Sequence, residues 1–138
     1  MTEFFLDASY AIALSSPPDQ YHARAVALAA QVGREKRRLI TTQAVVLEIG
    51  NALAKQRYRD AGARLLNVLE KDPSVEVVLL SADLFARAAK LYRDRLDKEW
   101  GLTDCVSFVV MQDRNLTEAL TTDDHFRQAG YRALLIEA

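Results

Sequence analysis

Five short runs of apolar and β-branched residues, separated by longer helical patterns, place the strongest constraint on the fold of this chain. Their length and composition are typical of buried strands, and they span residues 3–6, 38–42, 75–80, 117–121 and 131–136. Apolar residues recur at helical spacing between them, at 8–15, 20–32, 43–56, 60–71, 82–97 and 104–114. Strands that alternate with helices are typical of parallel sheets. The sequence therefore predicts an α/β fold with a mostly parallel central sheet of four to five strands, flanked by helices on both faces.

Length and composition indicate one domain over residues 1–138. Half of the 138 residues are hydrophobic, which is enough for a contiguous core, and no linker, repeat or low-complexity segment interrupts the pattern. The net charge of −1 does not by itself indicate a nucleic-acid partner. The single cysteine, Cys105, excludes an internal disulfide. Because the N-terminus lacks a basic region and no apolar run approaches the ~18 residues of a membrane span, we expect a cytoplasmic protein with no membrane partner.

Three acidic residues stand at the ends of predicted elements. Asp7 follows the first strand, Asp104 precedes the apolar segment CVSFVVM, and Asp123 follows the fourth strand. Each is also explained as a helix cap, with Thr103 an alternative cap beside Asp104, because short polar side chains are favoured at helix starts. Asp123 has a further structural explanation, since Arg127 lies four residues on as an ion partner.

Glu48 is harder to explain as a structural residue. It lies well inside a helix that Thr42 begins, so it is not a cap, and it borders an apolar face formed by Val45, Ile49 and their neighbours. No cation lies three or four residues away. A carboxylate at the border of a core is costly unless a distant cation or a metal ion compensates it.

The parallel sheet brings these four carboxylates together. Residues that follow parallel strands, and the helix N-termini that come next, share the carboxyl edge of the sheet, so Asp7, Glu48, Asp104 and Asp123 are expected around one crevice. Four carboxylates around one crevice repel one another unless divalent cations bind between them. Carboxylate oxygens without a His or Cys set suit hard ions, so the sequence predicts a site for Mg²⁺ or Mn²⁺.

At this point the chain resembles PIN-domain ribonucleases, specifically the VapC-like toxins of type II toxin–antitoxin pairs. The resemblance spans positions 4–130 and is carried by the segments FFLDASYAIAL, TTQAVVLEIGNAL, DKEWGLTDCVSFVVM and ALTTDDHFRQAG. It aligns the acidic quartet of the family with Asp7, Glu48, Asp104 and Asp123 and leaves Asp124 at a variable position. The resemblance implies a PIN-like fold, Mg²⁺- or Mn²⁺-dependent endonucleolytic cleavage of RNA, a homodimer and a cognate antitoxin.

For this chemistry the carboxylates receive separate roles. Asp7 and Asp104 are predicted as metal ligands, Glu48 as a ligand or water-orienting base, and Asp123 as an outer or second-metal ligand. The cations available for RNA phosphates are those of the segment REKRR at 34–38 together with Arg57, Arg59, Arg93 and Arg95, and Tyr58 is a candidate for base stacking.

Other chemistry-bearing residues have simpler explanations. Cys105 lies in an apolar helix beside an acid, which favours a buried thiol over a nucleophile. His125 is a possible metal ligand or a surface or packing residue at a helix start, and Trp100 is expected to pack the turn that presents Asp104.

Three other functions remain as alternatives. A haloacid-dehalogenase-type phosphatase would have a second Asp where the chain has Ser9. A phosphoacceptor signalling domain would need an acceptor Asp after a middle strand and a later strand-end Lys, whereas the strands here end in Thr42 and Ser81. A catalytically silent PIN-like protein-binding module would have lost one of the acids, and all four are present.

Overall fold

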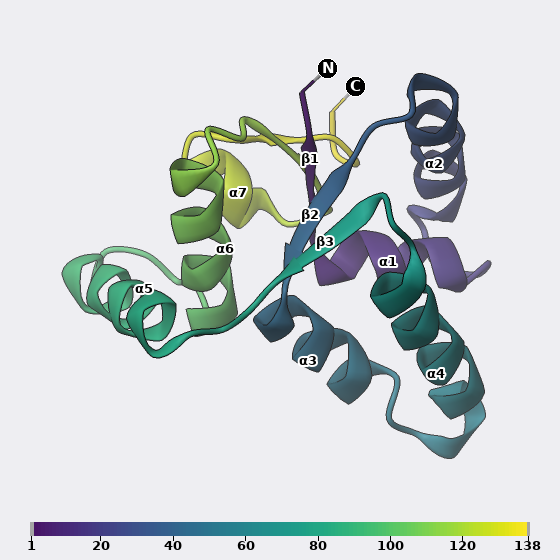
Figure 1. Ribbon diagram of the computed structural model, residues 1–138, viewed down its shortest axis with the longest axis horizontal. Coiled ribbons are helices and arrows are strands. Elements are labelled where there is room, and N and C mark those ends of the chain that lie inside the picture. The colour runs from purple at the N-terminus through teal and green to yellow at the C-terminus, as the bar shows by residue number, and fades with distance from the viewer. Residues whose placement is uncertain (1, 138) are drawn as a thin grey trace.

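A five-stranded parallel sheet forms the centre of the computed structural model, which describes residues 2–137 (Figure 1). Along the chain the strands are β1 (Phe4–Leu6), β2 (Leu39–Thr42), β3 (Val75–Val78), β4 (Glu118–Leu120) and β5 (Arg132–Ala133). Their order across the sheet is β3-β2-β1-β4-β5, and all four neighbouring pairs are parallel. The predicted α/β class and parallel sheet are confirmed.

Within residues 2–137, seven helices connect and cover the strands: α1 (Ala8–Ser15), α2 (His22–Glu35), α3 (Gln43–Ala52), α4 (Gln56–Lys71), α5 (Ala82–Asp94), α6 (Leu102–Asp113) and α7 (Asp124–Gln128). In Figure 1, α1, α2 and α4 lie to one side of the sheet, and α5, α6 and α7 lie to the other. The prediction of helices on both faces is therefore confirmed.

Of the predicted caps, those at Thr42 and Asp123 are present, and the one at Thr103 or Asp104 is wrong. The hydroxyl of Thr42 accepts the backbone N–H of Val45 at 3.1 Å, and Ser81 caps α5 in the same way. The apolar helix α6, however, begins at Leu102 with the extended residue Gly101 as its N-cap. Neither Thr103 nor Asp104 is the N-cap, and Asp104 instead lies in the first turn of the helix.

Some elements are shorter than predicted. β5 covers only two residues, whereas the apolar run continues to 136. Directly after the strand the chain turns, and the N–H of Ile136 donates to the carbonyl of Ala133. Leu134 and Leu135 are nevertheless buried, which shows that the apolar run reports burial and not strand length.

The core gathers around the first strand and the helices on its α6 side. Phe5 and Phe126 are fully buried, with ring centroids 6.1 Å apart. The ring of Phe108 meets that of Phe126 edge to face, with centroids 5.0 Å apart. Because Phe126 belongs to the five-residue helix α7, this packing attaches α7 firmly to β1 and α6.

The order of the strands reverses beside β1. From β1 the chain moves outward to β2 and β3, and it then returns to add β4 on the opposite side of β1. In open α/β sheets, ligands bind at the carboxyl edge where the order reverses in this way. Asp7 follows β1 and Thr121 follows β4, so both lie at this point of the sheet.

Candidate metal centre

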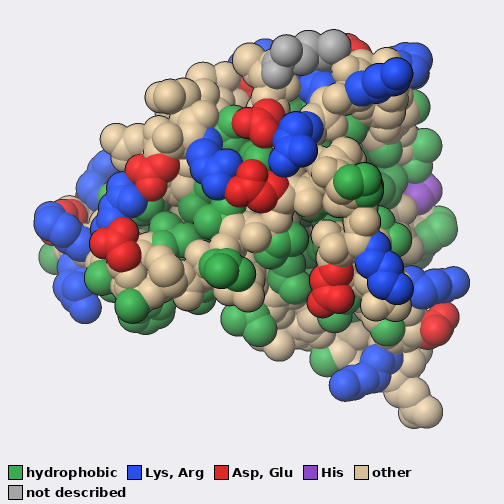
Figure 2. All heavy atoms as spheres, in the orientation of Figure 1, with side chains coloured by type: hydrophobic (Ala, Val, Ile, Leu, Met, Phe, Trp, Pro, Cys, Tyr) green, Lys and Arg blue, Asp and Glu red, His purple; other side chains and the backbone are tan. Residues whose placement is uncertain are grey.

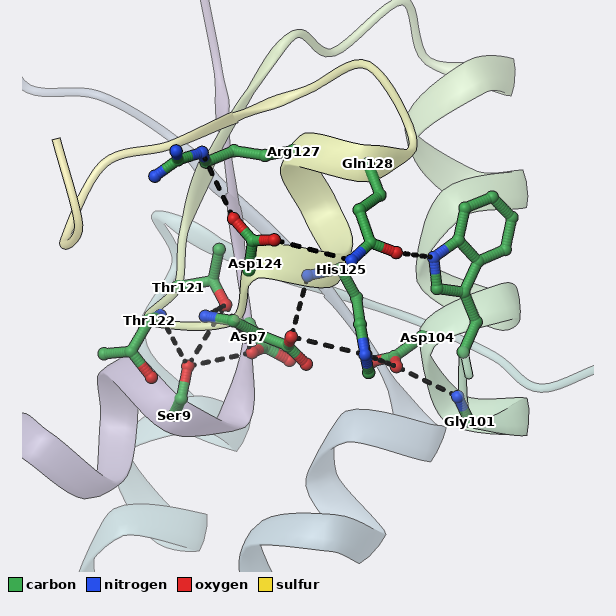
Figure 3. A network of polar contacts seen from close by, with 12 residues as sticks. Asp7, Ser9, Gly101, Asp104, Thr121, Thr122, Asp124, His125, Arg127 and Gln128 are labelled. Atoms are coloured by element: carbon green, nitrogen blue, oxygen red, sulfur yellow. Dashed lines mark hydrogen bonds and ion pairs between the residues drawn. The ribbon is translucent and has the colours of Figure 1, made fainter. Parts of the chain in front are cut away.

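Asp7 is a buried carboxylate held by two hydroxyl groups. Only 4% of the residue is exposed, and its Oδ2 accepts hydrogen bonds from Thr121 Oγ1 at 2.7 Å and from Ser9 Oγ at 2.9 Å (Figure 3). Although Asp7 occupies the N-cap position of α1, its side chain makes no capping hydrogen bond. Burial raises the pKa of the Asp7 carboxyl, against the opposing effect of the two hydroxyls. The side chain is therefore turned away from capping and toward the sheet edge.

Ser9 and Thr121 were not predicted as site residues. Both also accept backbone N–H groups, Ser9 from Thr122 and Thr121 from Asp123, each at 3.0 Å. This network joins the residues after β1 to those after β4 and fixes the orientation of the Asp7 carboxylate. The sequence places Ser9 two residues after Asp7, but the contacts of Thr121 with Asp7 and Ser9 join segments more than 110 residues apart, so local spacing gives no signal for them.

Asp104 reaches the same edge from the first turn of α6. Its Oδ2 accepts the backbone N–H of Gly101 at 3.1 Å and lies 3.1 Å from Nδ1 of His125 (Figure 3). The side chain is only 15% exposed. Burial, followed by the negative charge of Asp123, raises the pKa of Asp104 despite its contact with the histidine.

The tandem acids after β4 point in different directions. Asp123 Oδ1 accepts the backbone N–H of His125 at 2.9 Å and lies 3.3 Å from the Nδ1 of the same ring. Asp124 is exposed and pairs with Arg127 at 3.3 Å. The predicted ion pair between Asp123 and Arg127 is therefore wrong. Asp123 faces Asp104 and His125, whereas Asp124 is directed toward Arg127.

Glu48 completes the group from α3. It makes no hydrogen bond and no ion pair within the described residues 2–137. Although the residue as a whole is exposed, partial removal of its carboxyl from water and the charges of Asp7, Asp104 and Asp123 raise the pKa of Glu48 to about 7. The four predicted acids thus lie close enough to affect one another electrostatically.

The donor set fits a divalent cation. Asp104, Asp123 and His125 each offer one ligand atom, and these atoms lie within 4.8 Å of one another. Across residues 2–137, none of the four carboxylates pairs with a Lys or Arg side chain. A partly buried, mutually repelling group of carboxylates without Lys or Arg partners is stabilised by a bound metal ion, and oxygen ligands favour Mg²⁺ or Mn²⁺.

A family comparison decides the classification. The PIN domain model matches residues 4–130 of this chain. The chain belongs to the PIN domain family. A comparison of the sequence with curated proteins returned no match.

Two solved structures share the architecture of this PIN domain. One is VapC20 from Mycobacterium tuberculosis, described as a sarcin-ricin loop cleaving toxin, with a TM-score of 0.82, 23% identity, and coverage of 94% of this chain and 96% of that one. The other is VapBC2 from Rickettsia felis, bound to a DNA fragment from its promoter, with a TM-score of 0.66, 12% identity and 96% coverage of both chains. At these identities the likeness shows the shared fold alone.

The basic segment of this PIN domain at 34–38 lies away from the carboxylates. It ends α2 and leads into the amino end of β2, whereas the carboxylates lie at the carboxyl edge of the same sheet. Arg37 and Arg38 also pair with acids, Arg37 with Glu35 at 2.6 Å and Arg38 with Glu3 at 3.4 Å. We therefore do not assign this segment to substrate bound at the metal centre.

Cys105 and Trp100 have structural positions in the PIN domain. Burial raises the pKa of the Cys105 thiol to about 11, which favours the neutral thiol over a thiolate nucleophile at neutral pH. Trp100 is buried, packs edge to face on Phe108, and donates its indole N–H to Gln128 of α7 at 3.2 Å. As predicted, it packs the turn that leads to Asp104.

None of the helices in the part of the chain that the structure describes is long and apolar enough to cross a membrane.

The raised pKa of Glu48 predicts a pH-dependent stability. A carboxyl whose folded pKa lies above its unfolded value, here about 7 against 4.5, favours folding below pH 4.5 and loses that contribution as the pH rises through 7. We expect metal-free Glu48→Gln to be more stable than wild type at pH 8 by about 1 kcal/mol, allowing for solvent screening of an exposed side chain, and to differ little at pH 4.5. Urea unfolding at both pH values measures this. An equal difference at the two pH values would contradict it.

Proposed function

We propose that residues 1–138 act as one PIN-like domain that cleaves RNA endonucleolytically, using divalent metal ions, as the toxin of a toxin–antitoxin pair. The observation that carries the proposal is the convergence of four carboxylates, without Lys or Arg partners in residues 2–137, at the point of the sheet where ligands bind. Of the divalent cations, Mg²⁺ and Mn²⁺ match this oxygen-rich set best.

Each residue of the site has a separate role in the proposed reaction. Asp7, Asp104 and Asp123 would hold the metal, and Ser9 and Thr121 would keep the Asp7 carboxylate in one orientation. A bound Mg²⁺ or Mn²⁺ supplies charge for the phosphate oxygens and lowers the pKa of a water molecule. Glu48, with no hydrogen-bond partner in the described chain and a pKa of about 7, is placed to orient that water or accept its proton.

RNA as the substrate is supported by the likeness to VapC20, which is described as cleaving the sarcin-ricin loop. A surface groove of about 700 Å³ adds a path for a polynucleotide. Arg95 and Lys98 lie over the Trp100 ring in this groove, at 5.0 and 5.9 Å from its centroid, and Gly101 continues its lining to the first turn of α6. Since Asp104 stands in that turn, a strand in the groove would lead to the metal centre.

The cleavage assay uses matched acidic variants. RNA and DNA of the same sequence are incubated with wild type, Asp104→Asn and Asp124→Asn in the presence of Mn²⁺ and then of EDTA. We expect wild type and Asp124→Asn to cut only RNA and only with the metal, and Asp104→Asn to lose at least 10²-fold in rate. Cleavage that survives EDTA or Asp104→Asn would overturn the nuclease assignment. Metal binding without cleavage of any RNA would favour the protein-binding alternative.

We further propose a homodimer formed by the apolar surface of α3 and α5. Large apolar side chains are exposed there, with Leu47 of α3 at 61% and Phe85 of α5 at 47%, and both line one surface pocket. Figure 2 shows hydrophobic side chains on this face of the molecule, at the lower left where α5 lies. Isolated apolar residues are ordinary on a surface, but a contiguous group indicates an interface. Sedimentation would give twice the 15.5 kDa chain mass for wild type and the chain mass for Phe85→Asp. A monomeric wild type would contradict this arrangement.

A cognate antitoxin and a cytoplasmic location complete the proposal. The antitoxin is supported by the likeness to VapBC2, a complex that binds its own promoter DNA. Co-expression with the antitoxin should give a stable complex whose RNA cleavage is suppressed, and the complex should fractionate with the cytoplasm. An active nuclease that no antitoxin inhibits would remove the toxin role and leave the nuclease role intact.

A further inference from the structure

One nitrogen ligand stands among the carboxylates. Nδ1 of His125 lies 3.1 Å from Asp104 Oδ2 and 3.3 Å from Asp123 Oδ1. Figure 3 shows the imidazole beside Asp104, on the side of α7 that faces the site. The ring is 28% exposed, so it lies inside the rim of the site and not on open surface.

The spacing of these three atoms matches one coordination sphere. Adjacent ligands of an octahedral ion with bonds of about 2.1 Å are separated by about 3.0 Å, and opposite ligands by about 4.2 Å. The two distances from Nδ1 are close to the first value, and Asp104, Asp123 and His125 each have a ligand atom within 4.8 Å of those of the other two residues. An ion at this point would have the imidazole nitrogen next to both carboxylate oxygens.

The position of the ring is fixed by the fold. The backbone N–H of His125 donates to Asp123 Oδ1, which sets the first turn of α7. The next residue, Phe126, is fully buried between Phe5 and Phe108, and Gln128 accepts the indole N–H of Trp100. Such anchoring on both sides limits the ring to small adjustments, as a ligand position requires.

We propose that Nδ1 of His125 is a direct ligand of the ion bound by Asp104 and Asp123. A neutral imidazole with its proton on Nε2 presents a lone pair at Nδ1. Nitrogen ligands raise affinity for transition ions more than for Mg²⁺, which prefers oxygen, so the site discriminates in favour of Mn²⁺. This inference rests on the proposed metal centre and adds the ligand that sets its metal preference.

Pulsed electron paramagnetic resonance of bound Mn²⁺ tests the ligand directly. The chain has two histidines, and His22 lies outside the site with its Nδ1 2.8 Å from the carbonyl of Ala13. Protein labelled with ¹⁵N only in histidine should show a directly coordinated ¹⁵N in wild type and in the control His22→Gln. The signal should vanish in His125→Asn, and calorimetry should show a loss of Mn²⁺ affinity of about 10- to 100-fold, with a smaller loss for Mg²⁺.

The other outcomes separate this inference from the metal centre itself. Tight Mn²⁺ binding without a coordinated histidine nitrogen would overturn the inference and leave His125 as a hydrogen-bonding partner of Asp104. Equal losses of Mn²⁺ and Mg²⁺ affinity in His125→Asn would overturn the proposed metal preference. Absence of Mn²⁺ binding to wild type would overturn both the inference and the proposed function.

Discussion

Replacement of Asp7 by Asn should lower metal-dependent RNA cleavage by about 10³-fold without destabilising the metal-free protein. The loss in rate follows because a central charged ligand disappears, and metal ions contribute several kcal/mol to the stabilisation of such transition states. The amide oxygen of Asn can still accept the hydroxyls of Ser9 and Thr121, which hold Asp7 Oδ2 at 2.9 and 2.7 Å. The fold around the substituted residue is therefore retained.

The expected stability of metal-free Asp7→Asn follows from the raised pKa of Asp7 in the wild type. A carboxyl with a folded pKa above its ordinary value of 3.8 favours folding below that pH, and the contribution is lost as the pH rises through the folded pKa. At pH 7 the neutral Asn should therefore be as stable as the carboxylate or more so. Single-turnover cleavage and urea unfolding measure the two parts. An inactive variant that is also much less stable would mean that Asp7 is mainly structural.

Replacement of Phe126 by Ala should destabilise the protein by about 3–5 kcal/mol, the range for removing a fully buried aromatic ring. Phe126 is completely buried, and its ring contacts Phe5 and Phe108 at centroid distances of 6.1 and 5.0 Å. The helix that carries it has only five residues and depends on this packing for its position. Metal affinity should fall as well, because Asp123 and His125 belong to the same turn.

Urea unfolding of Phe126→Ala beside Tyr58→Ala provides the measurement and its control. Tyr58 is an aromatic residue on α4 that is 41% exposed, so its replacement should cost less than about 1 kcal/mol. If the two variants lose similar stability, the packing of α7 against the core is not what holds this helix. Phe126→Leu, which keeps most of the apolar volume, should recover much of both stability and metal affinity.

The sheet was predictable from the sequence because burial on both faces leaves a direct pattern. Short apolar runs such as FFL and LITT mark strands covered on both sides, and the helical segments between them require parallel crossovers. The gathering of the acids followed from the same topology, since one edge of the sheet collects whatever follows each strand. Glu48 was recognisable because a helix interior offers a carboxylate neither a cap nor a cation at that spacing.

Contacts between distant segments were not predictable in the same way. The hydroxyl of Thr121 meets Asp7 and Ser9 only after β1 and β4 pair, and the indole of Trp100 meets Gln128 only after α7 docks. Helix α6 begins two residues earlier than predicted. Thr103 and Asp104 are both residue types that favour a helix N-cap, but the chain is extended at Gly101 and becomes helical directly after it. The partner of Arg127 was misassigned because two adjacent acids lie within its reach.

Calorimetric titration of Mn²⁺ into the metal-free protein tests the central claim most directly, with Asp123→Asn and Asp124→Asn as a matched pair. These residues are adjacent in sequence, but Asp123 faces Asp104 and His125, whereas Asp124 pairs with Arg127 at the surface. The carboxylate centre predicts that wild type and Asp124→Asn bind Mn²⁺ alike and that Asp123→Asn loses at least ten-fold in affinity. Equal affinity in all three proteins, or no binding to wild type, would contradict the metal centre.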